Sequence, residues 1–201
     1  MRILTLLLFL FFFTGCAGVG VVSTSDPLAK LNDAEDLYVR QDRPLIAERL
    51  IREAMSTYRA REDQHGLGNS YREYGDLLAS PSVSGKWQKY YQDNGFLDRS
   101  VTYENRMEKA LEYYTKALEY YSLAISELQN GNHYDSLTNV YYNMAYSYYK
   151  LDDRLNACHF YGKTLEAYSE NIKRNPTARP NSSVGTVVEL VAAKKKLAGC
   201  E

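Results

Sequence analysis

The chain has 201 residues, 45% of them hydrophobic and 24% charged, and its 24 Lys and Arg against 25 Asp and Glu give a formal net charge of −1. This composition excludes a disordered chain and provides no general electrostatic attraction to nucleic acid. Tyrosine is unusually frequent, at 19 residues, and the three cysteines leave one without an intramolecular partner.

The first 15 residues have the features of a secretion signal. Arg2 precedes an apolar run from Ile3 to Phe13, which is about half of the ~20 residues that a membrane-spanning helix needs. The run ends in Phe13-Thr14-Gly15-Cys16, which resembles the lipobox of bacterial lipoproteins, with Phe13 in place of the usual leucine. The resemblance implies cleavage before Cys16 and acylation of Cys16. An ordinary secretory signal with a chance cysteine is the alternative.

The residues after Cys16 bear on the destination of the chain. By the same resemblance, an aspartate directly after the lipidated cysteine is associated with retention in the inner membrane. This chain has Ala17 at that position. The resemblance therefore implies a protein on the bacterial outer membrane that faces the periplasm, held by several acyl chains on one residue. Residues 16–27 are expected to form a lipidated tether, and no later stretch approaches spanning length.

From residue 28 onward, apolar residues recur at intervals of three and four, which predicts consecutive helices and an all-α fold. No convincing alternating pattern of a strand occurs. Turn-forming residues predict breaks at 41–44, 65–68, 80–82, 130–132, 152–153 and 175–185.

A common spacing relates these predicted helices. One set contains Leu31-Ala34-Tyr38, Tyr71-Tyr74-Gly75-Leu78 and Tyr141-Met144-Ala145-Tyr148, and the partner set contains Ala47-Ile51-Ala54, Ala110-Tyr114-Ala117 and Ala157-Tyr161-Thr164. This pattern resembles the tetratricopeptide repeat over residues 28–172. The resemblance implies a short solenoid of about three helix pairs whose first helices line a concave surface.

Two features depart from that family. Glu35 replaces the expected small residue, and the middle pair contains an insertion at about 79–103. The heptad spacing of Ala110, Ala117 and Ala124 predicts a long helix toward Asn130, and such a seam also suits an unrelated helical bundle, which is the alternative.

The C-terminal residues predict a cap on the solenoid. Residues 173–185 have a loop composition, and Thr186 and Glu189 fit a capping box at the start of a helix over 186–201. The apolar face of this helix would cover the exposed end of the last pair.

No catalytic motif is present, and the chain is not expected to be an enzyme. The three histidines lie in separate elements without metal-ligand spacing, so no metal and no cofactor are expected. Two functions remain. The first is an anchored scaffold that binds an envelope protein or peptide, a role that by the resemblance suits the assembly of an envelope complex. The second is a permanent structural subunit of such a complex. Beyond the membrane contact through the lipid, neither nucleic acid nor a small-molecule substrate is expected.

Candidate partner-binding residues come from two places. On the predicted helix that contains Tyr141, a row of tyrosines lies beside the packing face, and by the resemblance it would point into the concave surface. Aromatic residues in the insert suggest a short amphipathic helix. The candidate residues are Tyr142, Asn143, Tyr146, Tyr149, Lys150 and Trp87. The alternatives are that the stripe is covered as core and that the insert packs on its own chain.

The two remaining cysteines, Cys158 and Cys200, lie on the last repeat helix and just after the capping helix. In an oxidising compartment they would either form a disulfide or stay as a half-buried and a terminal thiol.

Overall fold

The chain is all-helical in the part that the computed structural model describes, residues 24–177 and 186–200, where no strand occurs. The helices are α1 (Pro27–Val39), α2 (Pro44–Ala60), α3 (Gln64–Leu78), α4 (Pro81–Ser84), α5 (Gln88–Asn94), α6 (Arg106–Asn130), α7 (Tyr134–Lys150), α8 (Arg154–Arg174) and α9 (Val187–Leu197). The all-α class expected from the sequence is confirmed. The predicted signal peptide, the tether up to residue 23 and residues 178–185 of the predicted loop lie outside the described residues. Within those residues, no helix combines the length and the apolar character needed to cross a bilayer.

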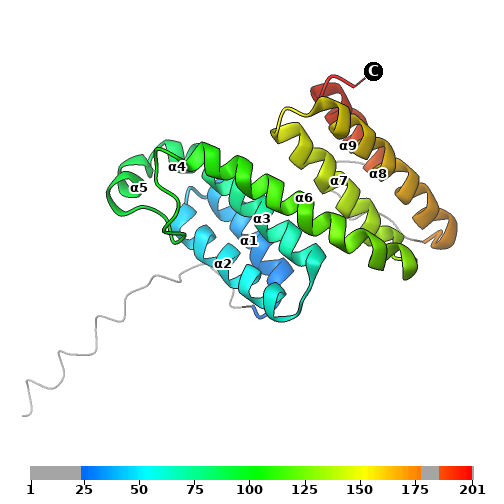
Figure 1. Cartoon of the computed structure of the whole chain (residues 1–201), viewed down its shortest axis with the longest axis horizontal. Coiled ribbons are helices and arrows are strands. Elements are labelled where there is room, and N and C mark those ends of the chain that lie inside the picture. The colour runs from blue at the N-terminus through cyan, green and yellow to red at the C-terminus, as the bar shows by residue number, and fades with distance from the viewer. Residues whose placement is uncertain (1–23, 178–185, 201) are drawn as a thin grey trace, which may run out of the picture.

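Consecutive helices form two groups that one long helix connects. α1 packs against α2 and α3, α3 against α6, α6 against α7, and α7 against α8. The 25 residues of α6 run from the α1–α3 group to the α7–α9 group (Figure 1). Tyr114 and Tyr121 are fully buried along α6 with Ala110 and Ala117, so the long helix and its predicted seam are confirmed.

The same turn recurs after three of these helices. α2, α6 and α7 are each followed by a non-glycine residue with positive φ: Glu62 (54°), Asn132 (57°) and Asp152 (58°). In each turn the next backbone N–H donates to the carbonyl five residues earlier, from Asp63 to Tyr58 (3.0 Å), His133 to Leu128 (2.9 Å) and Asp153 to Tyr148 (2.9 Å). This bond closes the helix end in the manner of a Schellman motif. The breaks predicted at 130–132 and 152–153 are confirmed.

The break predicted at 65–68 is wrong, because α3 begins at Gln64 and includes both glycines. The turn lies just before, and the Asp63 side chain caps α3 by accepting a hydrogen bond from the Gly66 N–H at 2.8 Å. A Cβ at Gly66 would lie 2.0 Å from Cδ1 of Tyr58. Glycine serves here to let α2 and α3 approach closely, and not to end a helix.

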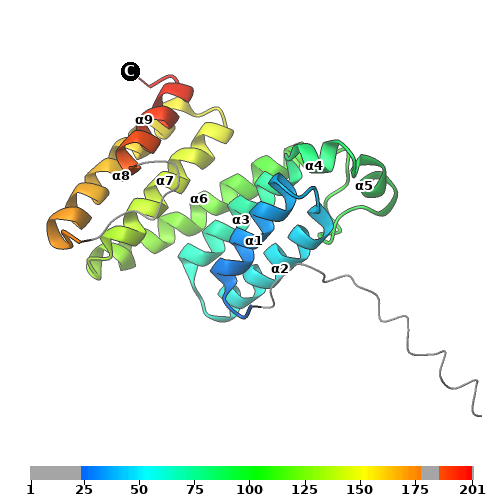
Figure 2. The same ribbon diagram turned by 180° about the vertical axis from the view of Figure 1, so that it is seen from behind.

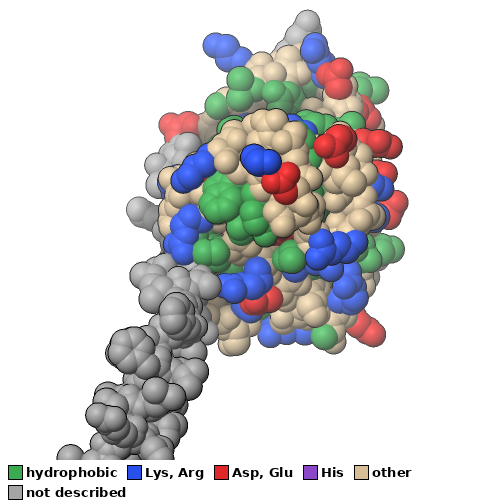
Figure 3. Space-filling model, turned by 90° about the vertical axis from the view of Figure 1, so that its left-hand side faces the viewer, with side chains coloured by type: hydrophobic (Ala, Val, Ile, Leu, Met, Phe, Trp, Pro, Cys, Tyr) green, Lys and Arg blue, Asp and Glu red, His purple; other side chains and the backbone are tan. Residues whose placement is uncertain are grey.

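The predicted insert forms α4, α5 and the irregular segment before α6. Trp87 precedes α5 and lies against the α1–α3 core, where its indole N–H donates to the backbone oxygen of Asp42 at 2.7 Å. Tyr91 and Phe96 are buried, and their rings stack 4.2 Å apart. These contacts favour the alternative in which the insert packs on its own chain. Hydrophobic side chains also remain visible at this end of the molecule (Figure 3), and Tyr90 is 42% exposed.

The C-terminal helix α9 packs on α8 through two buried residues, Val191 and Ala198. Its start has the predicted capping box, in which the Thr186 side chain accepts from the Glu189 N–H and the Glu189 carboxylate accepts from the Thr186 N–H. Cys158 and Cys200 are joined by a disulfide. Of the two alternatives that the sequence leaves open for these thiols, the structure has the bridge.

Candidate binding groove

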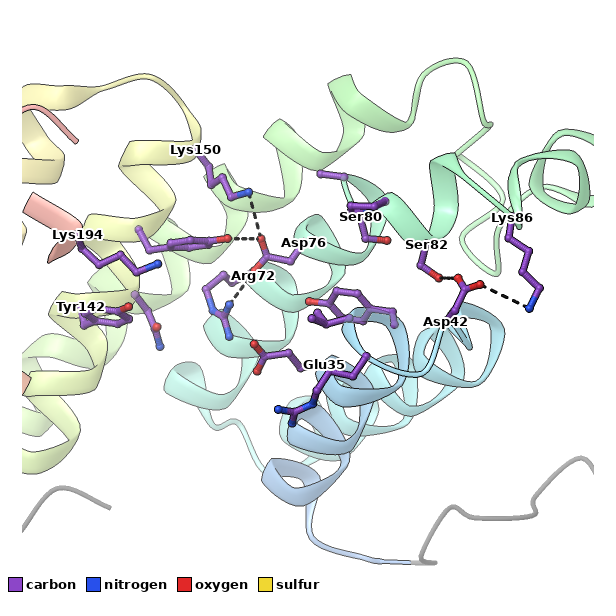
Figure 4. Close-up of a pocket in the computed structure, with 17 residues that line it drawn as sticks. Glu35, Asp42, Arg72, Asp76, Ser80, Ser82, Lys86, Tyr142, Lys150 and Lys194 are labelled. Atoms are coloured by element: carbon purple, nitrogen blue, oxygen red, sulfur yellow. Dashed lines mark hydrogen bonds and ion pairs between the residues drawn. The ribbon is translucent and has the colours of Figure 1, made fainter. Parts of the chain in front are cut away.

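A cavity of about 760 Å³ opens between the two helix groups. Side chains from α1, α3, α4, α7 and α9 line it, together with residues from the turns after α1 and α4. Seen from behind, α1 and α9 both lie toward the viewer, with α3 and α7 between them (Figure 2). Lys86 and Lys194 mark opposite ends of the lining (Figure 4), so the cavity is an elongated groove.

Four of the predicted partner-binding residues line this groove. Tyr142, Asn143, Tyr146 and Lys150 all project from α7 into it. An adjacent face of α7 forms the core, because Tyr141, Met144 and Ala145 are buried. Tyr142 and Tyr146 are half-buried, and they pack against the core while they line the groove.

Two predicted partner-binding residues lie elsewhere. Tyr149 is 40% exposed and is not part of the groove lining. Trp87 packs on the core beside Asp42, and its indole N–H is already engaged by the backbone there. The α7 stripe thus contributes two tyrosines to the groove, and the insert contributes Lys86 instead of its tryptophan.

Asp76 on α3 is the centre of the groove's hydrogen-bond network (Figure 4). Its Oδ1 accepts from the hydroxyls of Tyr114 at 2.7 Å and Tyr146 at 2.8 Å, and Lys150 Nζ lies 3.8 Å from the same oxygen. Its Oδ2 accepts from Arg72 Nη1 at 2.8 Å. Burial, followed by the charge of Asp76, raises the pKa of Tyr146, so this hydroxyl remains a donor. The network fixes the Tyr146 ring in the wall of the groove.

A second carboxylate, Glu73, lies behind this wall and is 2% exposed. It accepts hydrogen bonds from Arg72 Nη2 at 2.8 Å and from the Tyr38 hydroxyl at 2.7 Å. Burial, opposed by the charge of Arg72, raises the pKa of Glu73 from 4.5 to about 7. Arg72 thereby connects two acids, one at the surface of the groove and one beneath it.

Sequence reasoning missed Arg72, Asp76 and Lys194 as groove residues. The first two are four residues apart on a helix whose other face is apolar, and that spacing places two charges on one side of α3. Lys194 belongs to a run of three lysines in the C-terminal helix, for which the sequence predicts only a capping role. No periodicity indicates that α9 reaches the Tyr146 ring, because the two are brought together only by the packing of α9 on α8.

The groove offers binding groups: tyrosine rings, amide and hydroxyl groups, and cations. In the described part of the chain, no cluster of three or more His, Cys, Asp or Glu side chains is arranged to hold a metal ion. No protein-family model matches this chain, and no curated protein or solved structure matches it either.

Proposed function

We propose that this protein is a lipid-anchored scaffold of the outer membrane, facing the periplasm, that binds a protein or peptide partner through the groove and contributes to assembly of an envelope complex. The observation that carries the proposal is the groove itself, which Tyr142, Asn143 and Tyr146 line; each is half-buried, and the two tyrosines also pack against the core. Tyrosine provides contact area and a hydroxyl group at a low cost in side-chain entropy, which suits peptide capture.

The arrangement of the helices supports the interpretation of the fold as a tetratricopeptide-like solenoid. α1 with α2, α3 with α6, and α7 with α8 are neighbouring pairs, and α4 and α5 interrupt the middle pair. The first helices of all three pairs, α1, α3 and α7, line the groove, together with α4 and α9, and no residue of α2, α6 or α8 does. The recurring turn at Glu62, Asn132 and Asp152 is a further regularity that a repeat would produce.

The proposed anchor rests on the sequence alone. Phe13-Thr14-Gly15-Cys16 resembles a lipobox, and acylated Cys16 would hold the helical part close to the membrane. The proposal assigns the protein no catalytic role.

A comparison of two tyrosine variants tests this function. We expect Tyr142→Ala in the full-length chain to abolish recovery of the envelope partner, whereas Tyr149→Ala, at an exposed position outside the lining, retains it. Tyr142 also lies 6.1 Å from Tyr161, measured between ring centroids, so the melting temperature of each variant is measured in parallel. Equal partner recovery from both variants, or unfolding of the Tyr142→Ala chain, would remove Tyr142 from the binding surface.

A further inference from the structure

Resting on the proposed function, we infer that the α7–α9 end of the groove binds an acidic side chain of an extended peptide. The geometry that points to this partner is a set of three cations gathered around one tyrosine ring. Lys150 Nζ lies 5.3 Å, Arg72 Cζ 5.8 Å and Lys194 Nζ 5.9 Å from the centroid of Tyr146. These three cations come from α7, α3 and α9, so side chains of three helices place positive charge around the Tyr146 ring.

The acid that faces these cations is already occupied. Asp76 accepts two tyrosine hydroxyls and one Arg72 nitrogen, and Lys150 reaches it only at 3.8 Å. In the described ranges, no carboxylate lies within ion-pair distance of Lys194. Arg72 also pairs with the buried Glu73 at 2.8 Å. Three cations therefore face two acids at this end of the groove, and a carboxylate from a partner would neutralise the remaining positive charge.

The opposite wall is mixed in charge. Glu35 lines the groove from α1 and forms no ion pair within the described residues, and Arg40, which also lines it, pairs with Asp36. An acidic side chain is therefore favoured beside α7 and α9 over a position beside Glu35. The elongated shape between Lys86 and Lys194 suits an extended segment (Figure 4).

The C-terminal helix holds Lys194 in this position. Val191, one turn earlier, is fully buried, and Cys200 is joined to Cys158 of α8. Because α9 is attached at both points, Lys194 is presented by a fixed wall, and less ordering is needed when a peptide binds. α9 is thus a part of the binding site as well as the cap that the sequence predicts.

Fluorescence anisotropy with two labelled peptides tests the inference. The full-length chain in a non-ionic detergent is titrated with hexaglutamate and with hexaglutamine at low salt. We expect hexaglutamate to bind at least tenfold more tightly and Lys194→Gln to weaken it by about threefold or more. Lys196→Gln, which removes the same charge from an exposed position of α9, should leave the affinity unchanged. Glu35→Gln should strengthen hexaglutamate binding.

The inference would be overturned by equal affinity for the two peptides or by equal effects of Lys194→Gln and Lys196→Gln. Binding of anionic-lipid vesicles that depends on Lys194, while the protein shows no preference for hexaglutamate, would also overturn it. The proposed function fails separately, when the envelope partner is recovered equally from Tyr142→Ala and Tyr149→Ala. Partner recovery that needs Tyr142 but is insensitive to Lys194→Gln would refute the acidic partner and leave the scaffold intact.

Discussion

Gly68 of α3 lies directly against the ring of Tyr121 of α6. A Cβ built at Gly68 would be 2.5 Å from both Cδ1 and Cε1 of that ring, and the ring itself is fully buried. The Tyr121 hydroxyl donates to the Asn69 side chain at 2.9 Å, and Asn143 of α7 donates to the same oxygen at 3.0 Å. The close approach of α3 and α6 therefore also positions the helix that carries the groove tyrosines.

We expect Gly68→Ala to destabilise the protein by about 1–3 kcal/mol, because the new methyl group overpacks a buried ring that has no space to move. The measurement is the free energy of unfolding in urea. Gly162→Ala is the matched control, since a Cβ there meets nothing within 4 Å. In that helix interior we expect a gain of about 0.5–1 kcal/mol. Equal effects of the two substitutions would contradict the close contact.

Glu73 makes stability depend on pH in a defined direction. Because burial raises the pKa of Glu73 from 4.5 to about 7, the folded state binds the proton more tightly than the unfolded state. The favourable contribution is complete below about pH 4.5 and is lost as the pH rises through about 7. Besides burial, Arg72 and Tyr38 lower the pKa of Glu73, and Asp76 and Glu35 raise it.

Glu73→Gln should flatten the fall in the free energy of unfolding between pH 5 and pH 8 relative to the native chain, because glutamine keeps an acceptor for Tyr38 and does not titrate. Glu119→Gln, at an exposed position of α6, serves as the control and should preserve the native slope. Urea titrations at the two pH values supply the comparison. A Glu73→Gln slope as steep as that of the native chain would show that Glu73 does not change its protonation on unfolding.

The disulfide between Cys158 and Cys200 links positions 42 residues apart. Replacing both cysteines with serine should lower the free energy of unfolding by about 3–4 kcal/mol, because the unfolded chain then gains the freedom of an open loop. Native protein treated with a reductant should approach the variant, and the reductant should leave the variant unchanged. Free thiols at both positions in unreduced, unfolded protein would contradict the bridge.

Trp87 should contribute to stability and not to partner binding. Trp87→Phe removes the donor to the Asp42 backbone oxygen and is expected to cost about 1 kcal/mol of unfolding free energy, and Trp87→Ala should cost more. Tyr90→Phe, a substitution at the exposed neighbour, should stay within about 0.5 kcal/mol of the native chain. Unchanged stability of Trp87→Ala together with loss of the partner would assign the insert to an interface.

Acylation of Cys16 is tested by metabolic labelling with a fatty acid. We expect label on the native chain and none on Cys16→Ser, whose precursor should also keep its first 15 residues. Cys200→Ser is a suitable control, because it removes a different thiol and should retain the label. Equal label on the native chain and Cys16→Ser would remove the lipoprotein interpretation.

Periodicity and turn chemistry were sufficient to predict the helical class, the long α6 and the breaks around Asn132 and Asp152. They failed at Gly66 and Gly68, because a glycine that ends a helix and a glycine that admits a neighbouring ring have the same sequence signal. The groove was predictable only from the α7 side. The contacts of Asp76 with Tyr114 and Tyr146 join residues 38 and 70 positions apart, and such pairings depend on tertiary packing that no local pattern encodes.

The central claim is that the groove face of α7 meets a partner. Its most direct test is a photo-crosslinking amino acid placed at position 142 or at position 149 of the full-length chain, followed by illumination of native envelopes. We predict a discrete covalent adduct with one protein from position 142 and none from position 149. An adduct from position 149 alone, equal adducts from both positions, or no adduct from position 142 would contradict the claim.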